Sequence, residues 1–255
     1  MNFIISANTD IGLTKNTNQD SLSVKQINTE RGRMVFAVLC DGMGGLAKGE
    51  VASASVIYAF DKWVKERFPE ISALPVNEEV LKNQWNEIIQ DQNRTIQAYG
   101  GRLGVKLGTT AVVMLLTSEK YYIMNVGDSR AYEISDNLYQ LTKDQTFVER
   151  EVELGNMTPE QAETDPRRSV LLQCVGASDT VCPDFFVGET KTNASYMMCS
   201  DGFRHEITPQ EIYDNMQPAV LLDDDSMNRN TVKLIELNKQ RSERDNISVI
   251  LIRTY

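Results

Sequence analysis

The sequence predicts an α+β sandwich in which antiparallel sheets are covered by helices. Strand-like runs come in blocks separated by short turns, as in β-meanders. Long helical patterns fall between these blocks rather than after every strand, which argues against a doubly wound parallel sheet. The chain has 255 residues, of which 41% are hydrophobic. That content supports an extensive core without disulfides or other staples.

Nine segments carry strand-like patterns, with apolar and β-branched residues bounded by turn residues. They are residues 2–7, 20–25, 34–40, 109–116, 121–126, 131–135, 184–190, 196–200 and 247–254. Because several follow one another after short turns, we expect antiparallel pairing within each block.

Three segments carry long helical patterns: 49–68, 78–102 and about 227–241. In the second, apolar side chains recur near a 3.6-residue period, as expected for a helix with one buried face. They are Val80, Leu81, Trp85, Ile88, Ile89 and Ile96. No repeat, low-complexity tract or linker divides the chain, so we expect one domain over residues 1–255.

Residues 143–168 differ from their surroundings and predict a helical insertion on the sheet. Thr158 is suited to cap a short helix whose first residue is Pro159, and Asp165 with Pro166 ends the helical pattern. The segment is a candidate mobile cover, although composition alone is equally consistent with structural padding.

Composition excludes several classes of function. The net charge of −10 leaves no basic surplus for nucleic acid or an anionic membrane. No leader-like segment and no apolar run of about 20 residues is visible, so we expect a cytoplasmic protein without a membrane span. The four cysteines show no CxxC pairing, which indicates reduced thiols. With one histidine, His205, a zinc site of the usual N/S type is improbable, so a metal would be held by oxygen.

Four aspartates follow or precede apolar runs and adjoin Gly or Asn. Asp41 and Asp201 each end an apolar strand and precede Gly, Asp128 follows Val126-Gly127, and Asp245 precedes Asn246 and the last strand. A buried carboxylate is costly unless a cation meets it, so four such strand ends could converge on hard divalent ions. For each aspartate alone, a turn residue that hydrogen-bonds its own backbone is the favoured alternative.

Seven motifs, in order, resemble the bacterial metal-dependent protein phosphatases of the type 2C class. They are Gly12-x-x-Lys15-x-x-Asn18-Gln19-Asp20, Asp41-Gly42-Met43-Gly44-Gly45, Gly108-Thr109-Thr110, Val126-Gly127-Asp128-Ser129-Arg130, Leu141-Thr142-x-Asp144, Ser200-Asp201-Gly202 and Asp245-Asn246. They extend from the first expected strand to the last. The resemblance implies a four-layer α-β-β-α sandwich of two antiparallel sheets flanked by helix pairs, with a flap at about residues 143–168.

The resemblance also implies a metal site. Asp41 would bridge two Mg²⁺ or Mn²⁺ ions, the Gly42 carbonyl would bind one of them, and Asp201 and Asp245 would bind the other. A third, weaker ion would lie between Asp128 and Asp201. Such ions lower the pKa of bound water and offset phosphoryl charge. Asp20 and Asn246 would contact the metal ligands rather than the metal ions.

Several positions depart from the family pattern. Lys15 stands where an arginine usually clamps the substrate phosphate, which predicts looser binding because an ammonium lacks the planar fork. Gln19 replaces a glutamate that reaches a metal through water, and Met43 and Gln145 replace histidines. With Met43 the general acid is unassigned, and a metal-bound water is our hypothesis. We expect His205 to be structural.

The sequence therefore predicts a cytoplasmic serine/threonine protein phosphatase that hydrolyses phosphoserine and phosphothreonine through water activated by a binuclear centre. Phosphorylated proteins would be its substrates, and a serine/threonine kinase would oppose it. The alternative is a pseudophosphatase or phosphoprotein-binding regulator with the same fold and little turnover. The departures from the family pattern at Lys15 and Gln19 favour this alternative.

Overall fold

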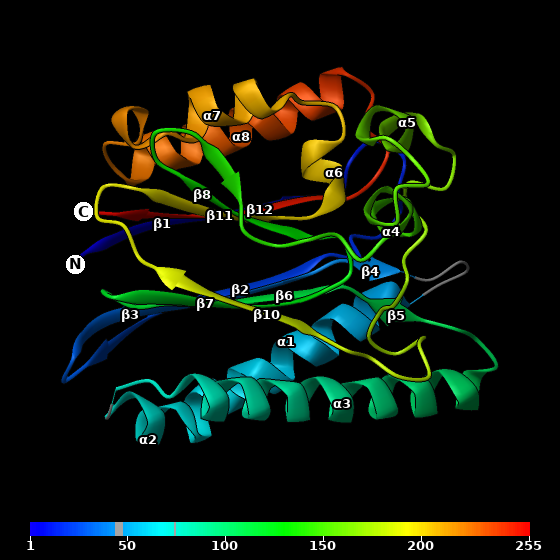
Figure 1. The fold of residues 1–255 in the computed structure, drawn as a ribbon, viewed down its shortest axis with the longest axis horizontal. Helices are drawn as coiled ribbons and strands as arrows, with labels where there is room; N and C mark the ends of the chain where they lie inside the picture. The colour runs from blue at the N-terminus through cyan, green and yellow to red at the C-terminus, as the bar shows by residue number, and fades with distance from the viewer. Residues whose placement is uncertain (44–47, 74) are drawn as a thin grey trace.

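Two five-stranded antiparallel sheets lie face to face, and each is covered on its outer side by helices (Figure 1). The computed structural model describes residues 1–43, 48–73 and 75–255. The first sheet has the order β1 (Phe3–Asp10), β12 (Ile247–Thr254), β11 (Ser195–Cys199), β8 (Arg130–Ile134) and β9 (Leu138–Gln140). The second has the order β10 (Asp184–Glu189), β7 (Lys120–Val126), β6 (Ala111–Leu116), β3 (Gly32–Cys40) and β2 (Ser21–Thr29). The four-layer α+β sandwich is thereby confirmed.

Helices α1 (Gly49–Glu66), α2 (Phe68–Ser72) and α3 (Glu78–Leu103) cover the second sheet, and α7 (Pro209–Met216) and α8 (Asp224–Gln240) cover the first (Figure 1). Asn77 caps α3 by accepting a hydrogen bond from the Val80 N–H, and Gly104, with φ of 68°, ends it. Leu81, Trp85 and Ile89 lie on its buried face, at the spacing that the sequence indicated.

Strand β3 is a continuous apolar run because both of its faces are covered. Its residues from Met34 to Cys40 are all buried, because the strand has a helix layer on one side and a sheet on the other. Phe36 and Val38 face α1 and α3, whereas Val35 and Leu39 face the first sheet. The strand is therefore held firmly on both faces up to the residue before Asp41.

The predicted insertion contains two short helices, α4 (Phe147–Glu153) and α5 (Pro159–Thr164). The cap at Thr158 is confirmed, and Gln161 completes a reciprocal capping box. At the base of the segment, Thr146 forms a bridge with Leu171. Residues 146–171 therefore leave and rejoin the sheets as one closed loop.

Some elements were missed or misjudged. The predicted helix at 49–68 ends at Glu66, and α2 follows after Arg67. The short strands β4 (Gly42–Met43), β5 (Gly108–Thr109) and β9, the four-residue α6 (Asp201–Arg204), α7 and the 3₁₀ turn η1 (Pro218–Val220) were not foreseen, because elements this short carry too few periods to detect.

None of the four cysteines is paired in a disulfide, and Cys40 and Cys199 are buried. Burial raises the pKa of the Cys199 thiol to about 12, so it packs as a neutral side chain. Among the described residues, no helix is both long and apolar enough to cross a membrane.

Candidate metal centre

The sandwich gathers the predicted aspartates at one end. Asp41 follows β3, Asp128 follows β7, Asp201 begins α6 directly after β11, and Asp245 lies just before β12. Figure 1 shows these strand ends on the same side, beneath α4, α5 and α6. The carboxylates of Asp128, Asp201 and Asp245 all act electrostatically on Asp41, so the four lie together rather than on separate faces.

The motif around Thr109 and Thr110 holds the backbone of Asp41. The Asp41 N–H donates to Thr110 Oγ1 at 2.9 Å, and the Asp41 carbonyl accepts from the Thr110 N–H at 2.8 Å and from Thr109 Oγ1 at 2.9 Å. Gly42, in β4, has no room for a side chain, because a Cβ there would lie 2.4 Å from the Gly49 carbonyl oxygen. Gly44 and Gly45 of this motif lie outside the described residues.

The loop before β2 is tied to the start of β12 through Asn246. Its side-chain oxygen accepts from the Gln19 N–H at 2.8 Å, and its amide donates to the loop's carbonyl groups. Gly12 has φ of 74°, and a Cβ there would lie 2.1 Å from the Asp245 carbonyl oxygen. This close approach brings Lys15 Nζ to 2.7 Å from Asp245 Oδ1.

Asp20, expected to contact the ligands rather than the metal ions, is itself buried within the cluster. It is 8% exposed, and neither carboxylate oxygen has a hydrogen-bond partner among the described residues. Burial raises the pKa of Asp20 to about 7; the nearby Ser248 and Ser200 hydroxyls, which lie outside hydrogen-bonding geometry, lower it in part, and the charges of Asp201 and Asp245 add to the rise. Gln19 points elsewhere: its amide nitrogen lies 3.4 Å from Glu50 Oε2 on α1.

Two further carboxyl groups have raised pKa values. Burial, followed by the neighbouring Asp20 and Asp201, raises the pKa of Asp41 well above its usual range. Burial and the charge of Asp201 raise the pKa of Asp128 to about 7. Lys15 opposes this excess of negative charge: partial burial lowers its pKa, but the contact with Asp245 and the charges of Asp41 and Asp201 together raise it overall.

The donor set fits hard divalent cations in its chemistry. Several buried carboxylates lie near enough to repel one another, and Asp201 Oδ1, like both oxygens of Asp20, has no hydrogen-bond partner among the described residues. Oxygen ligands of this kind suit Mg²⁺ and Mn²⁺. In the described part of the chain, no group of three or more His, Cys, Asp or Glu side chains lies close enough together to hold a metal ion.

For Asp245 the turn interpretation also holds in part, because Oδ1 accepts the Asn246 N–H at 2.7 Å. Its other carboxylate oxygen remains available as a donor atom.

The sequence did not reveal the ionic contacts around the cluster. His205, expected to be structural, has Nε2 3.4 Å from Asp201 Oδ2 and Nδ1 3.3 Å from Glu243 Oε2. Burial lowers the pKa of His205, but Glu243 and Asp201 raise it above its usual value overall. The acidic residue two positions before Asp245 was the available signal, although charged residues are too common in turns to single it out.

Asp144 joins the flap to the same end of the sandwich. It accepts two hydrogen bonds from Arg130, at 2.8 and 2.7 Å, and its Oδ2 lies 3.4 Å from Arg204 Nη2. Arg204 also donates to the Asp128 carbonyl at 3.2 Å. The two arginines therefore hold the Asp128 turn and the start of the flap together.

Gln145 holds the start of the flap in place through two side-chain hydrogen bonds. Its Oε1 accepts the Gly127 N–H at 2.8 Å, and its amide donates to Asp184 Oδ2 at 2.8 Å. Gln145 is buried, so these bonds fix the flap's first residues to β10 and to the turn that carries Asp128.

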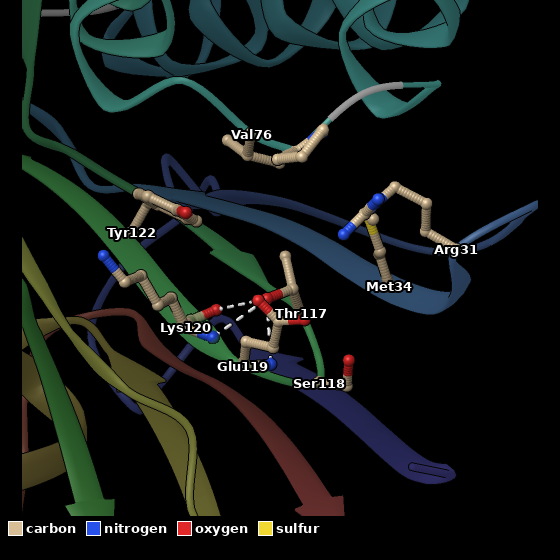
Figure 2. A pocket seen from close by; sticks show the side chains of 9 residues that line it. Arg31, Met34, Val76, Thr117, Ser118, Glu119, Lys120 and Tyr122 are labelled. Atoms are coloured by element: carbon tan, nitrogen blue, oxygen red, sulfur yellow. Dashed lines mark hydrogen bonds between the residues drawn. The ribbon is translucent and has the colours of Figure 1, made fainter.

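A separate cavity of about 210 Å³ lies at the other end of the second sheet (Figure 2). Met34 at the start of β3, the turn at Thr117 and the loop at Val76 line it. No carboxylate of the cluster is among its lining residues. Its position opposite Asp41 on β3 separates it from the chemistry described here.

The profile of the family described as "Protein phosphatase 2C" matches residues 14–233. The chain belongs to the protein phosphatase 2C family. Within this family, it is 29% identical to "Serine/threonine phosphatase stp" of Listeria welshimeri over 248 residues, which cover 96% of this chain and 93% of that protein.

Solved structures of this family have the same fold. The serine/threonine phosphatase PstP/Ppp of Mycobacterium tuberculosis aligns with a TM-score of 0.82 and 28% identity, covering 99% of this chain and 98% of that chain. The catalytic domain of PstP in complex with 2 manganese ions aligns with a TM-score of 0.77 and 26% identity, covering 99% of each chain. The predicted class, a bacterial-type serine/threonine protein phosphatase, is confirmed.

Proposed function

We propose that this protein phosphatase 2C member hydrolyses phosphoserine and phosphothreonine in proteins, using two divalent cations, Mn²⁺ or Mg²⁺. Asp41, Asp201, Asp245 and the Gly42 carbonyl would hold them, and Asp128 with Asp201 would offer a weaker third position. When bound, such cations make water nucleophilic near neutral pH and offset the charge of the phosphoryl group. The observation that carries the proposal is the buried group of carboxylates with raised pKa values and unpaired oxygens.

The remaining residues position the reactants. Lys15 lies at the rim of the cluster with its side chain 38% exposed, where its ammonium can meet a substrate phosphate. Asn246 and Thr110 hold the backbones that carry Asp245 and Asp41. This fixed backbone matters because catalysis by positioning is lost when ligands move by about 1 Å.

We also propose phosphorylated proteins as substrates, a serine/threonine kinase as the opposing enzyme, and the cytoplasm as the compartment. Family membership supports the first two. The net charge of −10 supports the expectation that nucleic acid is not a partner.

Phosphate release from a phosphopeptide panel, with Mn²⁺ and with a chelator, tests the proposal. We expect Mn²⁺-dependent release for the natural chain and a loss of about a thousandfold for Asp41→Asn, the size expected when several kcal/mol of transition-state stabilisation are removed. Activity that survives this substitution would contradict the assigned site. A chain that binds Mn²⁺ but releases no phosphate would instead be a pseudophosphatase.

A further inference from the structure

A chain of contacts outside the seven motifs joins two of the proposed ligands. His205 Nε2 lies 3.4 Å from Asp201 Oδ2, and His205 Nδ1 lies 3.3 Å from Glu243 Oε2. The other oxygen of Glu243, Oε1, accepts the backbone N–H groups of Arg244 at 2.6 Å and Asp245 at 2.8 Å. Asp201 is thus connected, through two side chains, to the backbone of Asp245.

The turn that carries Glu243 is built firmly. Ser242 has φ of 73°, a backbone conformation that residues other than glycine seldom adopt. The Glu243 N–H donates to the Asn238 carbonyl at 3.0 Å. The buried Asn238 side chain donates in turn to the Phe203 carbonyl at 2.8 Å, which links the end of α8 to α6. The left-handed Ser242 and the 6→1 hydrogen bond from Glu243 end α8 in the manner common at helix C-termini, and so fix the point at which Glu243 leaves the helix.

Glu243 itself is deeply placed, since its side chain is 7% exposed. Both of its oxygens face donor groups, so it is not a solvated surface charge. The two oxygens of Asp201 differ: Oδ2 faces His205, whereas Oδ1 is buried without a hydrogen-bond partner among the described residues. The histidine therefore restricts the carboxylate through one oxygen and leaves the other as a donor atom.

We propose that His205 and Glu243 act as positioning residues that tie the Asp201 carboxylate to the backbone of Asp245, so that divalent-cation affinity depends on this pair. The inference rests on the proposed function and adds to it two residues that do not touch the substrate. Residues that orient ligands in this way commonly contribute tenfold to a hundredfold to metal affinity.

Mn²⁺ binding by calorimetry on the full chain, stripped with a chelator beforehand, measures this contribution directly. We expect His205→Ala and Glu243→Gln each to weaken Mn²⁺ binding about tenfold. Glu243→Gln keeps a carbonyl oxygen for the Asp245 N–H but loses the acceptor for His205. Because the contacts form one chain, the double variant should bind about as weakly as either single variant. Glu206 is exposed and follows His205 directly, so Glu206→Ala is the matched control and should bind Mn²⁺ like the natural chain.

Steady-state kinetics separate positioning from other roles. At saturating Mn²⁺ the variants should recover kcat to within about threefold, with an unchanged KM for a phosphopeptide, because the pair acts only through the ligands. If far-UV circular dichroism shows that His205→Ala does not fold, His205→Gln replaces it, since the longer amide fills the space.

Three outcomes would overturn the inference. Mn²⁺ affinities within twofold of the natural chain would remove the pair from ligand positioning while leaving the proposed function intact. A kcat that stays a hundredfold low at saturating Mn²⁺ would assign His205 a direct role in the reaction. A natural chain that binds no Mn²⁺ would contradict the proposed function itself, and with it the pair's role.

Discussion

Strand β3 joins two regions of opposite character. At Phe36 it contributes to an aromatic cluster with Trp63 and Trp85, whose ring centroids lie 5.4 and 5.9 Å from that of Phe36. Five residues later, directly after the strand has ended, Asp41 lies among carboxylates whose pKa values are raised by burial and mutual repulsion. The first region stabilises the fold through apolar burial, whereas the second destabilises the metal-free protein. The firmly packed part of the strand is thus joined directly to a part where buried carboxyl groups repel one another.

The largest effect on stability should come from the aromatic cluster. Trp85 is fully buried, so Trp85→Ala should lower the free energy of unfolding by about 3–5 kcal/mol, through lost burial and the resulting cavity. Urea denaturation measures this loss. Trp85→Phe is the milder companion, because it also removes a buried indole N–H that has no partner among the described residues.

If the two regions are separable, Trp85→Phe should bind Mn²⁺ as tightly as the natural chain. A parallel fall in Mn²⁺ affinity and stability would show that the aromatic packing sets the ligand geometry directly, and the comparison would fail.

The next effect has the opposite sign and comes from the carboxylates. The folded-state pKa of Asp20 is about 7, above an unfolded value near 3.9, so the folded chain holds this proton more tightly. Its contribution therefore becomes unfavourable as the pH rises from about 4 to about 7. Asp20→Asn should raise the stability of the chelator-treated protein at pH 8 by roughly 2–4 kcal/mol, with little change at pH 4.

Urea denaturation at both pH values tests this, with the exposed Asp179→Asn as control. Mn²⁺ should stabilise the natural chain more than Asp20→Asn, because the charge that weakens the fold also attracts the cation. Equal or lower stability of metal-free Asp20→Asn at pH 8 would contradict the view that this end of the sandwich stores repulsion.

The sequence predicted strand β3, helix α3 and the carboxylate positions for different reasons, whereas the aromatic cluster itself was not predicted. Strand β3 and helix α3 were visible because their apolar residues follow regular periods over many residues. The carboxylates were visible because each adjoins Gly or Asn at a strand end, and because the seven motifs occur in order. The domain count remains a prediction.

What the sequence could not give is contact between single side chains distant in the chain. Glu243 and His205 meet across 38 positions only because α6 and the end of α8 are joined by Asn238. Nothing in the local sequence of Asp20 reports that its carboxylate is buried without a hydrogen-bond partner among the described residues. Such facts depend on tertiary packing, which local patterns do not encode.

The smallest effect concerns Lys15, the cation at the edge of the carboxylate region. Lys15→Ala should raise KM for a phosphopeptide about tenfold, the size of one hydrogen bond to a charged group, because Nζ would no longer meet the substrate phosphate. Mn²⁺ affinity should hold or rise slightly, since Lys15 also pairs with Asp245, a proposed ligand, at 2.7 Å. Lys15→Arg is the matched control and should lower KM, because a guanidinium offers two donors in one plane. An unchanged KM in Lys15→Ala, together with tighter Mn²⁺ binding, would mean that Lys15 serves only to neutralise Asp245. Lys15 would then contribute to the stability of the carboxylate cluster and not to recognition of the phosphate.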